Sequence, residues 1–204
     1  NAALKGVSMH GVRESLLDAQ SEAIGIPLLK MYVSEGTNSE YEQKMEILLL
    51  RARSEGIGHV IFGDIFLEDL KKYRQSQLAK TGISAVFPLW KRDTTELIHQ
   101  FSDLGFKAIV VCVNEKFLDK SFCGRIIDRN FINDLPQNVD VCGENGEFHT
   151  FVFDGPLFMK PIVFTKGEMV YRKYAAPKRS ENNCFQKTGE TEDYGFYFCD
   201  LLPV

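Results

Sequence analysis

The chain has 204 residues, of which 44% are hydrophobic and 25% are charged, and 16 of them are phenylalanine. This composition is typical of a globular protein with a substantial core, and it excludes an intrinsically disordered chain. The formal net charge is −4, and no block of Lys and Arg is dense enough to indicate contact with a phosphate backbone, so we expect no nucleic-acid partner.

No apolar run reaches the roughly 20 residues that a membrane span needs, and no signal peptide is visible. We therefore expect a cytoplasmic protein with no membrane partner. The 5 cysteines are widely spaced and form no CxxC pair, which predicts reduced, mostly buried thiols and no metal site. The oligomeric state is left open.

The first part of the chain alternates strand-like and helix-like segments. Strands are predicted over 27–33, 59–64, 84–90 and 107–114, and helices over 39–56, 65–82 and 94–105. Strands that are buried on both faces and separated by helices are typical of a parallel α/β sheet. Such a sheet binds ligands at the carboxyl ends of its strands, so the polar residues that follow each strand are the candidates for a site.

From about residue 139 the pattern changes to antiparallel strands. Residues 148–158 and 160–174 are predicted to be antiparallel strands joined by a Gly-Pro turn, and 196–204 to be a last strand. Residues 175–195 are polar and weakly patterned, which predicts a loop.

Asp64 follows a predicted buried strand, next to Gly63, which would let a ligand approach the backbone. A carboxylate at this position suits a magnesium–phosphate group, a ribose hydroxyl or a substrate amine, and the alternative is a cap on the next helix. Arg74 lies ten residues later and is predicted to be too far along the helix to pair with Asp64.

The segment SMHGVR, residues 8–13, contains Ser8, His10 and Arg13 around a flexible glycine. These side chains could contact a nucleotide or another anion at a strand end. The alternative is the start of a helix that Ser8 caps, with Arg13 exposed.

The densest polar cluster lies in VCGENGEFHTFVFDGP, residues 141–156. Glu144 and Glu147 flank Asn145-Gly146, a turn-forming pair, so a turn would bring both carboxylates to one side. Paired carboxylates bind an amine or a cation, or divide into acid and base. His149 falls on the same face of the following strand as Phe151 and could line a pocket. The alternative is a solvated hairpin tip.

Two further hypotheses concern neighbouring residues. Arg125 and Asp128 are spaced for an ion pair one helical turn apart, although Arg125 could instead bind an anionic substrate. Cys142 with His149 could form a nucleophile–base pair, but no oxyanion-hole signature accompanies them.

Taken in order, six segments resemble one known family: VSMHGVRESLLDAQSEAIGIPL, VIFGDIFLEDLKKYR, VFPLW, GFKAIVVCVN, CGRIID and CGENGEFHTFVFDGP. They are similar to the diphthine–ammonia ligases, a branch of the PP-loop ATP pyrophosphatases, over roughly residues 5–174. The resemblance implies a Rossmann-like, adenine nucleotide α-hydrolase-like domain over 1–104 and a smaller α+β substrate domain over 105–204. It also implies an ATP-dependent, AMP-forming amide ligase that uses Mg²⁺ and ammonia and acts on a small-molecule or protein-borne carboxylate.

The resemblance also implies roles for individual residues. Ser8, His10, Gly63 and Asp64 would bind the nucleotide. Glu144, Asn145, Glu147 and His149, together with Arg125, would bind the substrate. Asp64 and Glu147 would be the catalytic pair.

Two departures from the family pattern bear on this interpretation. The SGGKDS-type phosphate loop is absent from the 204 residues, and we expect it upstream of Asn1; a catalytically degenerate nucleotide-binding module is the alternative. The diphthamide branch reads Glu-Gly-Gly-Glu followed by an acidic residue, whereas this chain has Asn145 and His149. This variant resembles the bacterial branch, for which amidation in cobalamin salvage is a further alternative.

Overall fold

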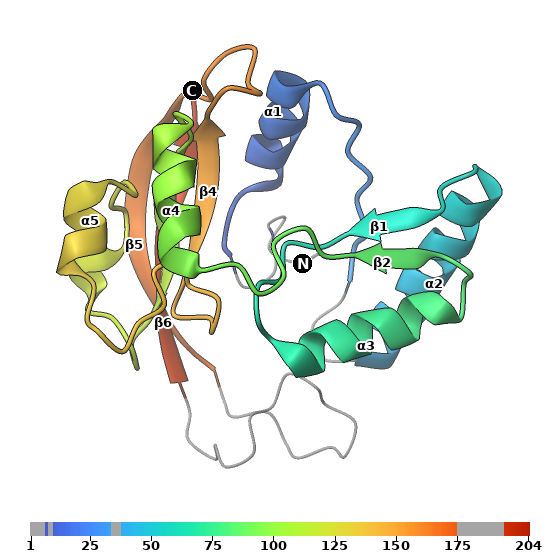
Figure 1. The fold of residues 1–204 in the computed structure, drawn as a ribbon. Helices are drawn as coiled ribbons and strands as arrows, with labels where there is room; N and C mark the ends of the chain where they lie inside the picture. The colour runs from blue at the N-terminus through green and yellow to red at the C-terminus, as the bar shows by residue number, and fades with distance from the viewer. Residues whose placement is uncertain (1–6, 8–9, 34–37, 175–193) are drawn as a thin grey trace.

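The computed structural model describes residues 7, 10–33, 38–174 and 194–204, which form a mixed α/β fold with two sheets (Figure 1). The smaller sheet is parallel and consists of β1 (His59–Ile61) and β2 (Ser84–Val86). Its inner face packs against α2 (Asn38–Ser54) and α3 (Glu68–Ala79). The helices predicted over 39–56 and 65–82 correspond to α2 and α3. Each observed helix begins and ends within three residues of the predicted bounds.

The larger sheet is antiparallel, with its four strands in the order β4-β3-β6-β5. The strands are β3 (Lys107–Asn114), β4 (Phe148–Asp154), β5 (Phe164–Tyr174) and β6 (Tyr194–Pro203). The helices associated with this sheet are α1 (Glu14–Ile24), α4 (Thr94–Asp103), α5 (Arg129–Asp134) and the short 3₁₀ helix η1 (Lys120–Phe122).

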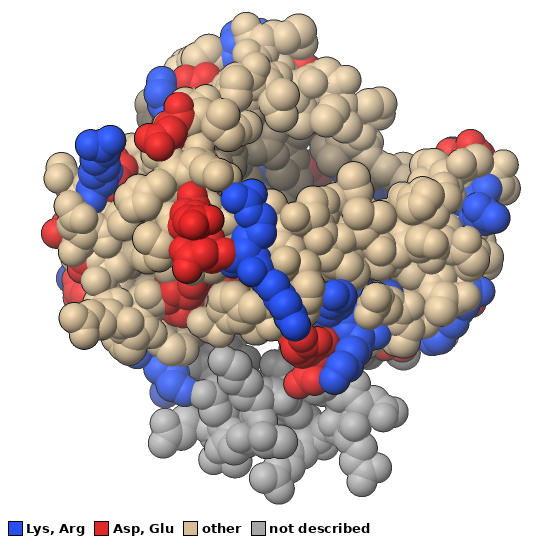
Figure 2. Space-filling view, in the orientation of Figure 1, with Lys and Arg blue, Asp and Glu red and all other residues tan. Residues whose placement is uncertain are grey.

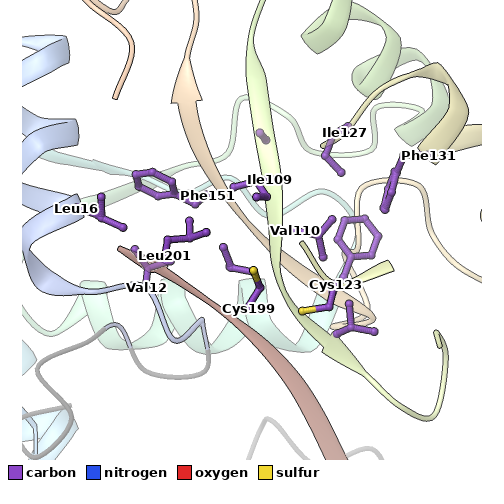
Figure 3. Close-up of a cluster of buried hydrophobic side chains, with 14 of the residues drawn as sticks. Val12, Leu16, Ile109, Val110, Cys123, Ile127, Phe131, Phe151, Cys199 and Leu201 are labelled. Carbon is purple, nitrogen blue, oxygen red and sulfur yellow. The ribbon is translucent and has the colours of Figure 1, made fainter. Parts of the chain in front are cut away.

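The main core is built on both faces of β3. Six consecutive residues of this strand are at most 2% exposed. Ile109 lies on the same side as Leu16 and Phe151, and Val110 lies on the side of Ile127 and Phe131 (Figure 3). Burial of a strand on both faces requires apolar residues at every position, which explains the unbroken run in the sequence.

The predicted direction of β3 is wrong. Residues 107–114 form a strand, as expected, but they pair antiparallel with β4 and β6 and do not join the parallel sheet. A continuous apolar run indicates that both faces are buried, and it carries no information about the direction of the neighbouring strands.

Two other sequence predictions also need correction. The strands predicted over 148–158 and 160–174 do not pair with each other, because β3 and β6 lie between β4 and β5. Residues 27–33 have no regular secondary structure, although a strand was predicted there. Lys30 in this segment forms ion pairs with Glu14 and Asp18 of α1, at 2.7 and 2.6 Å, so its polar side chain ties the segment to a helix.

The hydrophobic cluster around the larger sheet includes residues on both sides of the predicted domain boundary at 104/105. Val12, Leu16 and Ile98 pack in the same cluster as β3 and β4. The division into 1–104 and 105–204 remains a prediction. The loop predicted over 175–195 lies almost entirely outside the described residues.

Replacement of Phe131 tests whether α5 is an integral part of this core. Phe131 is fully buried, and its ring meets those of Phe122 and Phe148 edge to face. Phe131→Ala is expected to lower the free energy of unfolding by about 3–5 kcal/mol because it leaves a cavity. Urea denaturation measures this loss. The matched control is Leu157→Ala, at a position 65% exposed, and an equal loss in both variants would contradict the prediction.

Candidate functional site

The side chain and the backbone of Asp140 shape the turn that contains both predicted glutamates. Asp140 Oδ1 accepts hydrogen bonds from the backbone N–H groups of Cys142, at 3.0 Å, and Glu144, at 3.2 Å. The N–H of Asp140 donates to Glu147 Oε1 at 3.0 Å. Gly143 and Gly146 have positive φ angles of 70° and 83°, which side chains other than glycine rarely adopt. The turn is therefore held from within before any ligand binds.

Glu147 is a buried carboxylate with one satisfied oxygen and one unsatisfied oxygen. Its side chain is 1% exposed. Oε1 accepts from the Asp140 N–H and from the Asn145 amide, each at 3.0 Å. Oε2 is buried and has no hydrogen-bond partner among the described residues. An unpartnered buried carboxylate oxygen is costly, so this oxygen is suited to receive a donor from a ligand.

Glu144 connects the turn to the end of β1. Its Oε1 accepts the N–H of Ile65 at 2.7 Å and, more weakly, that of Phe66 at 3.4 Å. Burial raises the pKa of Glu144, and the negative charges of Asp64 and Asp140 raise it further, against the effect of the two backbone donors. The structure thus brings Glu144 close to Asp64, as a shared site requires.

The prediction that Arg74 cannot reach Asp64 is wrong. Asp64 is 7% exposed, and its Oδ2 lies 2.8 Å from Arg74 Nε, while Arg74 Nη2 donates to Oδ1 at 3.2 Å. The reason is that α3 begins only at Glu68, so Asp64 precedes the helix and the chain turns back toward Arg74. The Arg74 guanidinium also lies 4.4 Å from the centre of the Phe62 ring.

His10 and His149 stack on each other, with ring centroids 4.3 Å apart. Burial, with a smaller contribution from the neighbouring His10, lowers the pKa of His149 to about 4. Burial also lowers the pKa of His10, partly offset by a backbone hydrogen bond to Thr150. The sequence had assigned these histidines to opposite ends of the site, and the structure brings them together. Ser8, the remaining predicted nucleotide contact, lies outside the described residues.

Arg125 is engaged away from the turn. Its Nη2 lies 2.7 Å from Asp134, and its guanidinium lies over the rings of Phe122 and Phe131. The predicted pair with Asp128 does not form, because Asp128 caps α5 by accepting the N–H of Phe131 at 2.7 Å. Gly63, by contrast, is exposed directly before Asp64.

Cys142 is poorly placed to be a nucleophile. Its thiol donates to the backbone carbonyl of Thr94 at 3.3 Å. Burial, together with the nearby carboxylates of Asp140 and Glu144, raises its pKa to about 12. The thiolate needed for attack is therefore strongly disfavoured, which argues against the Cys142–His149 pair.

The described residues do not offer a resident magnesium site. No group of three or more His, Cys, Asp or Glu side chains among them is arranged to hold a metal ion. The one carboxylate at the end of β1 is already paired with Arg74. Mg²⁺ commonly binds through one or two carboxylates together with substrate phosphates, so the metal fits this chain only as a companion of a bound nucleotide.

Sequence reasoning missed Asp140, which organises the turn. Its signal was present: an aspartate side chain in a turn commonly accepts a hydrogen bond from the backbone N–H two residues on, here that of Cys142. The face of the molecule shown in Figure 2 mixes acidic and basic side chains, without a broad basic area, and is hollowed between the parts that contain α1 and β1.

In the portion of the chain that is described, no helix is both long and apolar enough to cross a membrane.

Comparison with known proteins identifies the family that the chain resembles. Residues 93–181 match the diphthamide synthase C-terminal domain. The chain is 27% identical to a diphthine–ammonia ligase from Bos taurus and 29% identical to one from Mus musculus, in each case over 76% of this chain and 64% of the relative. A diphthine–ammonia ligase from Danio rerio is 27% identical over 78% of this chain and 69% of the relative. The predicted resemblance is confirmed, and the chain spans about 64% of the length of the two mammalian relatives.

Removal of the Glu144 carboxylate is expected to loosen the loop after β1. In Glu144→Ala, hydrogen exchange at the Ile65 amide should accelerate by about tenfold or more, because its acceptor is lost. Glu144→Gln keeps an oxygen at the same place and should have a smaller effect. Exchange measured by NMR tests this, with Glu68→Ala, at a side chain 54% exposed, as the control. Unchanged exchange at Ile65 would contradict the assigned contact.

The stacked histidines predict a pH dependence of stability. The unfolded chain binds a proton at His149 as the pH falls through about 6.5, whereas the folded protein does so only near pH 4. The corresponding stability is complete above about pH 6.5 and is lost progressively down to about pH 4. His149→Gln should remove roughly 2–3 kcal/mol of the change in unfolding free energy across this window.

Urea denaturation at several pH values measures this difference. The control is His99→Gln, at an exposed position on α4. If the two variants showed the same pH dependence, the histidine stack would not be the cause.

Proposed function

We propose that the protein is an ATP-dependent, AMP-forming amide ligase, which adenylates a carboxylate and transfers ammonia to it. Similarity to diphthine–ammonia ligases over 76% of the chain supports this reaction class. The observation that carries the proposal is the contact of Glu144 with the Ile65 N–H, directly after Asp64. This contact supports a single site in which the predicted acceptor end adjoins the predicted nucleotide end.

The nucleotide end consists of the loop after β1 and the start of α1. Gly63 is exposed there, and Asp64 is held by Arg74. We assign the phosphate side of ATP to Gly63 and Asp64, with Arg74 positioning the carboxylate, and the nucleoside side to Ser8 and His10. The Rossmann-like domain of the family is part of this proposal. The phosphate loop of the family is not among these 204 residues, so the chain is assigned only the strand-end contacts.

The acceptor end consists of the turn at residues 140–147. In the first step the acceptor carboxylate attacks the α-phosphorus of ATP, and pyrophosphate leaves. In the second step ammonia attacks the acyl carbon, the bond from that carbon to the phosphate oxygen breaks, AMP leaves, and one proton is released. The unpartnered Oε2 of Glu147 is suited to hold the incoming amine through an N–H group and to accept that proton.

Asn145 and His149 bear on the choice of acceptor. Asn145 donates to Glu147 and so positions the carboxylate. His149 is largely neutral at pH 7, since its pKa lies near 4, and therefore presents no charge to the acceptor. An acidic residue in the same region, as in the diphthamide branch, would favour a cationic acceptor. The acceptor of this protein is thus proposed to differ from diphthine. The alternative to diphthine is a small-molecule acid, such as one in cobalamin salvage.

Glu147→Gln provides the test of this function. In the full natural chain, given ATP, ammonium and a panel of carboxylic acids, we expect the wild type to release AMP and pyrophosphate and to form an amide. The variant should form amide about 10²–10⁴-fold more slowly, because the proton acceptor is lost. Its affinity for ATP should change by less than about twofold.

The control is Glu115→Gln. Glu115 Oε1 accepts a hydrogen bond from the Tyr171 hydroxyl of β5 at 3.0 Å and from no group of the turn among the described residues, so its replacement should leave amide formation unchanged. Loss of ATP affinity in Glu147→Gln would contradict the division between nucleotide and acceptor ends. Binding of ATP by the wild type without AMP or pyrophosphate release would favour a degenerate nucleotide-binding module.

A further inference from the structure

A cavity of about 450 Å³ lies between α4 and the face of the larger sheet formed by β3 and β4. Its wall is mostly apolar and includes Leu97 and Phe101 of α4, Ala108 of β3 and Val152 of β4. This volume falls within the range of small-molecule pockets, which are typically apolar with a few polar groups that fix the orientation of the ligand.

The cavity adjoins the site described above. Ile65, whose N–H Glu144 binds, is one of its lining residues, and so are Val141 and Cys142 of the turn. The N–H of Lys91 donates to the carbonyl of Ile65 at 2.7 Å, which fixes the segment before α4 against the loop after β1. A ligand in the cavity would therefore extend toward the loop that follows Asp64.

Arg92 is the one cationic side chain among the lining residues. It is half-buried, and its Nη2 donates to Gln100 Oε1, a neutral partner, at 2.9 Å. None of the described carboxylates forms an ion pair with it. A partly buried guanidinium beside an apolar cavity, without an anionic partner, matches a ligand that combines a carboxylate with an apolar body.

We infer that this cavity binds the apolar body of a small organic acid and that Arg92 holds the acid's carboxylate at the cavity mouth, facing the loop after Asp64. This inference rests on the proposed function, because it names the class of acceptor that the ligase would activate. The Thr150 side chain, which also lines the cavity, supplies one hydroxyl for a polar substituent on that body.

Trp90, the only tryptophan in the chain, lies between the lining residues Leu89 and Arg92 and serves as a fluorescent reporter. Titration with phenylbutyrate, and separately with its neutral amide phenylbutyramide, tests the inference without ATP or ammonium. We expect the wild type to bind the acid at least about tenfold more tightly than the amide. Arg92→Gln should abolish this preference and leave the affinity for the amide unchanged.

Two further variants keep the test decisive. Lys91→Gln, at a neighbouring side chain that is 71% exposed and does not line the cavity, should retain the preference for the acid. Val152→Phe fills part of the cavity and should weaken both ligands by about tenfold. Equal binding of acid and amide by the wild type, no binding of the acid up to about 10 mM, or an equal effect of Arg92→Gln and Lys91→Gln would overturn the inference.

The binding test and the test of the proposed function can fail separately. If the acid binds through Arg92 but the full chain releases no AMP, the cavity assignment stands and the ligase proposal falls. If the full chain amidates an acid at a rate that Arg92→Gln does not change, the ligase proposal stands and the cavity assignment falls.

Discussion

The contact between Glu144 and the N–H groups of Ile65 and Phe66 is the interaction on which the site depends. It joins a turn that precedes β4 of the antiparallel sheet to a loop that follows β1 of the parallel sheet. A carboxylate that accepts backbone hydrogen bonds gives a stronger contact than a neutral acceptor would. Without this contact, the carboxylates of Asp64 and Glu147 would belong to separately positioned segments, and neither segment alone has the groups that the proposed two-step reaction requires.

The site retains several polar groups in unfavourable surroundings. Glu147 has a buried oxygen with no hydrogen-bond partner in the described part of the chain, Glu144 has a raised pKa, and His149 has a lowered pKa. In both shifted groups burial is the largest cause, because the charged form loses its hydration. Ionisable groups in such surroundings are typical of functional sites, since they gain most from a ligand that supplies the missing partner.

The hydrogen bonds within the turn offset part of this cost. Asp140 accepts two backbone N–H groups and donates its own N–H to Glu147, so the turn keeps its shape by local contacts. Gly143 is required for a second reason, because a Cβ atom there would lie 2.8 Å from the carbonyl oxygen of Phe148. The position of the unsatisfied Glu147 oxygen is thus maintained by residues that would not themselves contact a substrate.

The sequence by itself determined the features that depend on local pattern. These are the helices at 38–54 and 68–79 within a few residues, the parallel strands that begin at His59 and Ser84, the strand at 107–114, the family resemblance, and the existence of a turn around Asn145-Gly146. Only the tertiary structure decided which distant groups meet: Glu144 with Ile65, Arg74 with Asp64, His10 with His149, and β3 with antiparallel neighbours. The physical reason is that turn geometry and burial are encoded by residues adjacent in the chain, whereas strand direction and the partner of a buried charge depend on how separate segments pack.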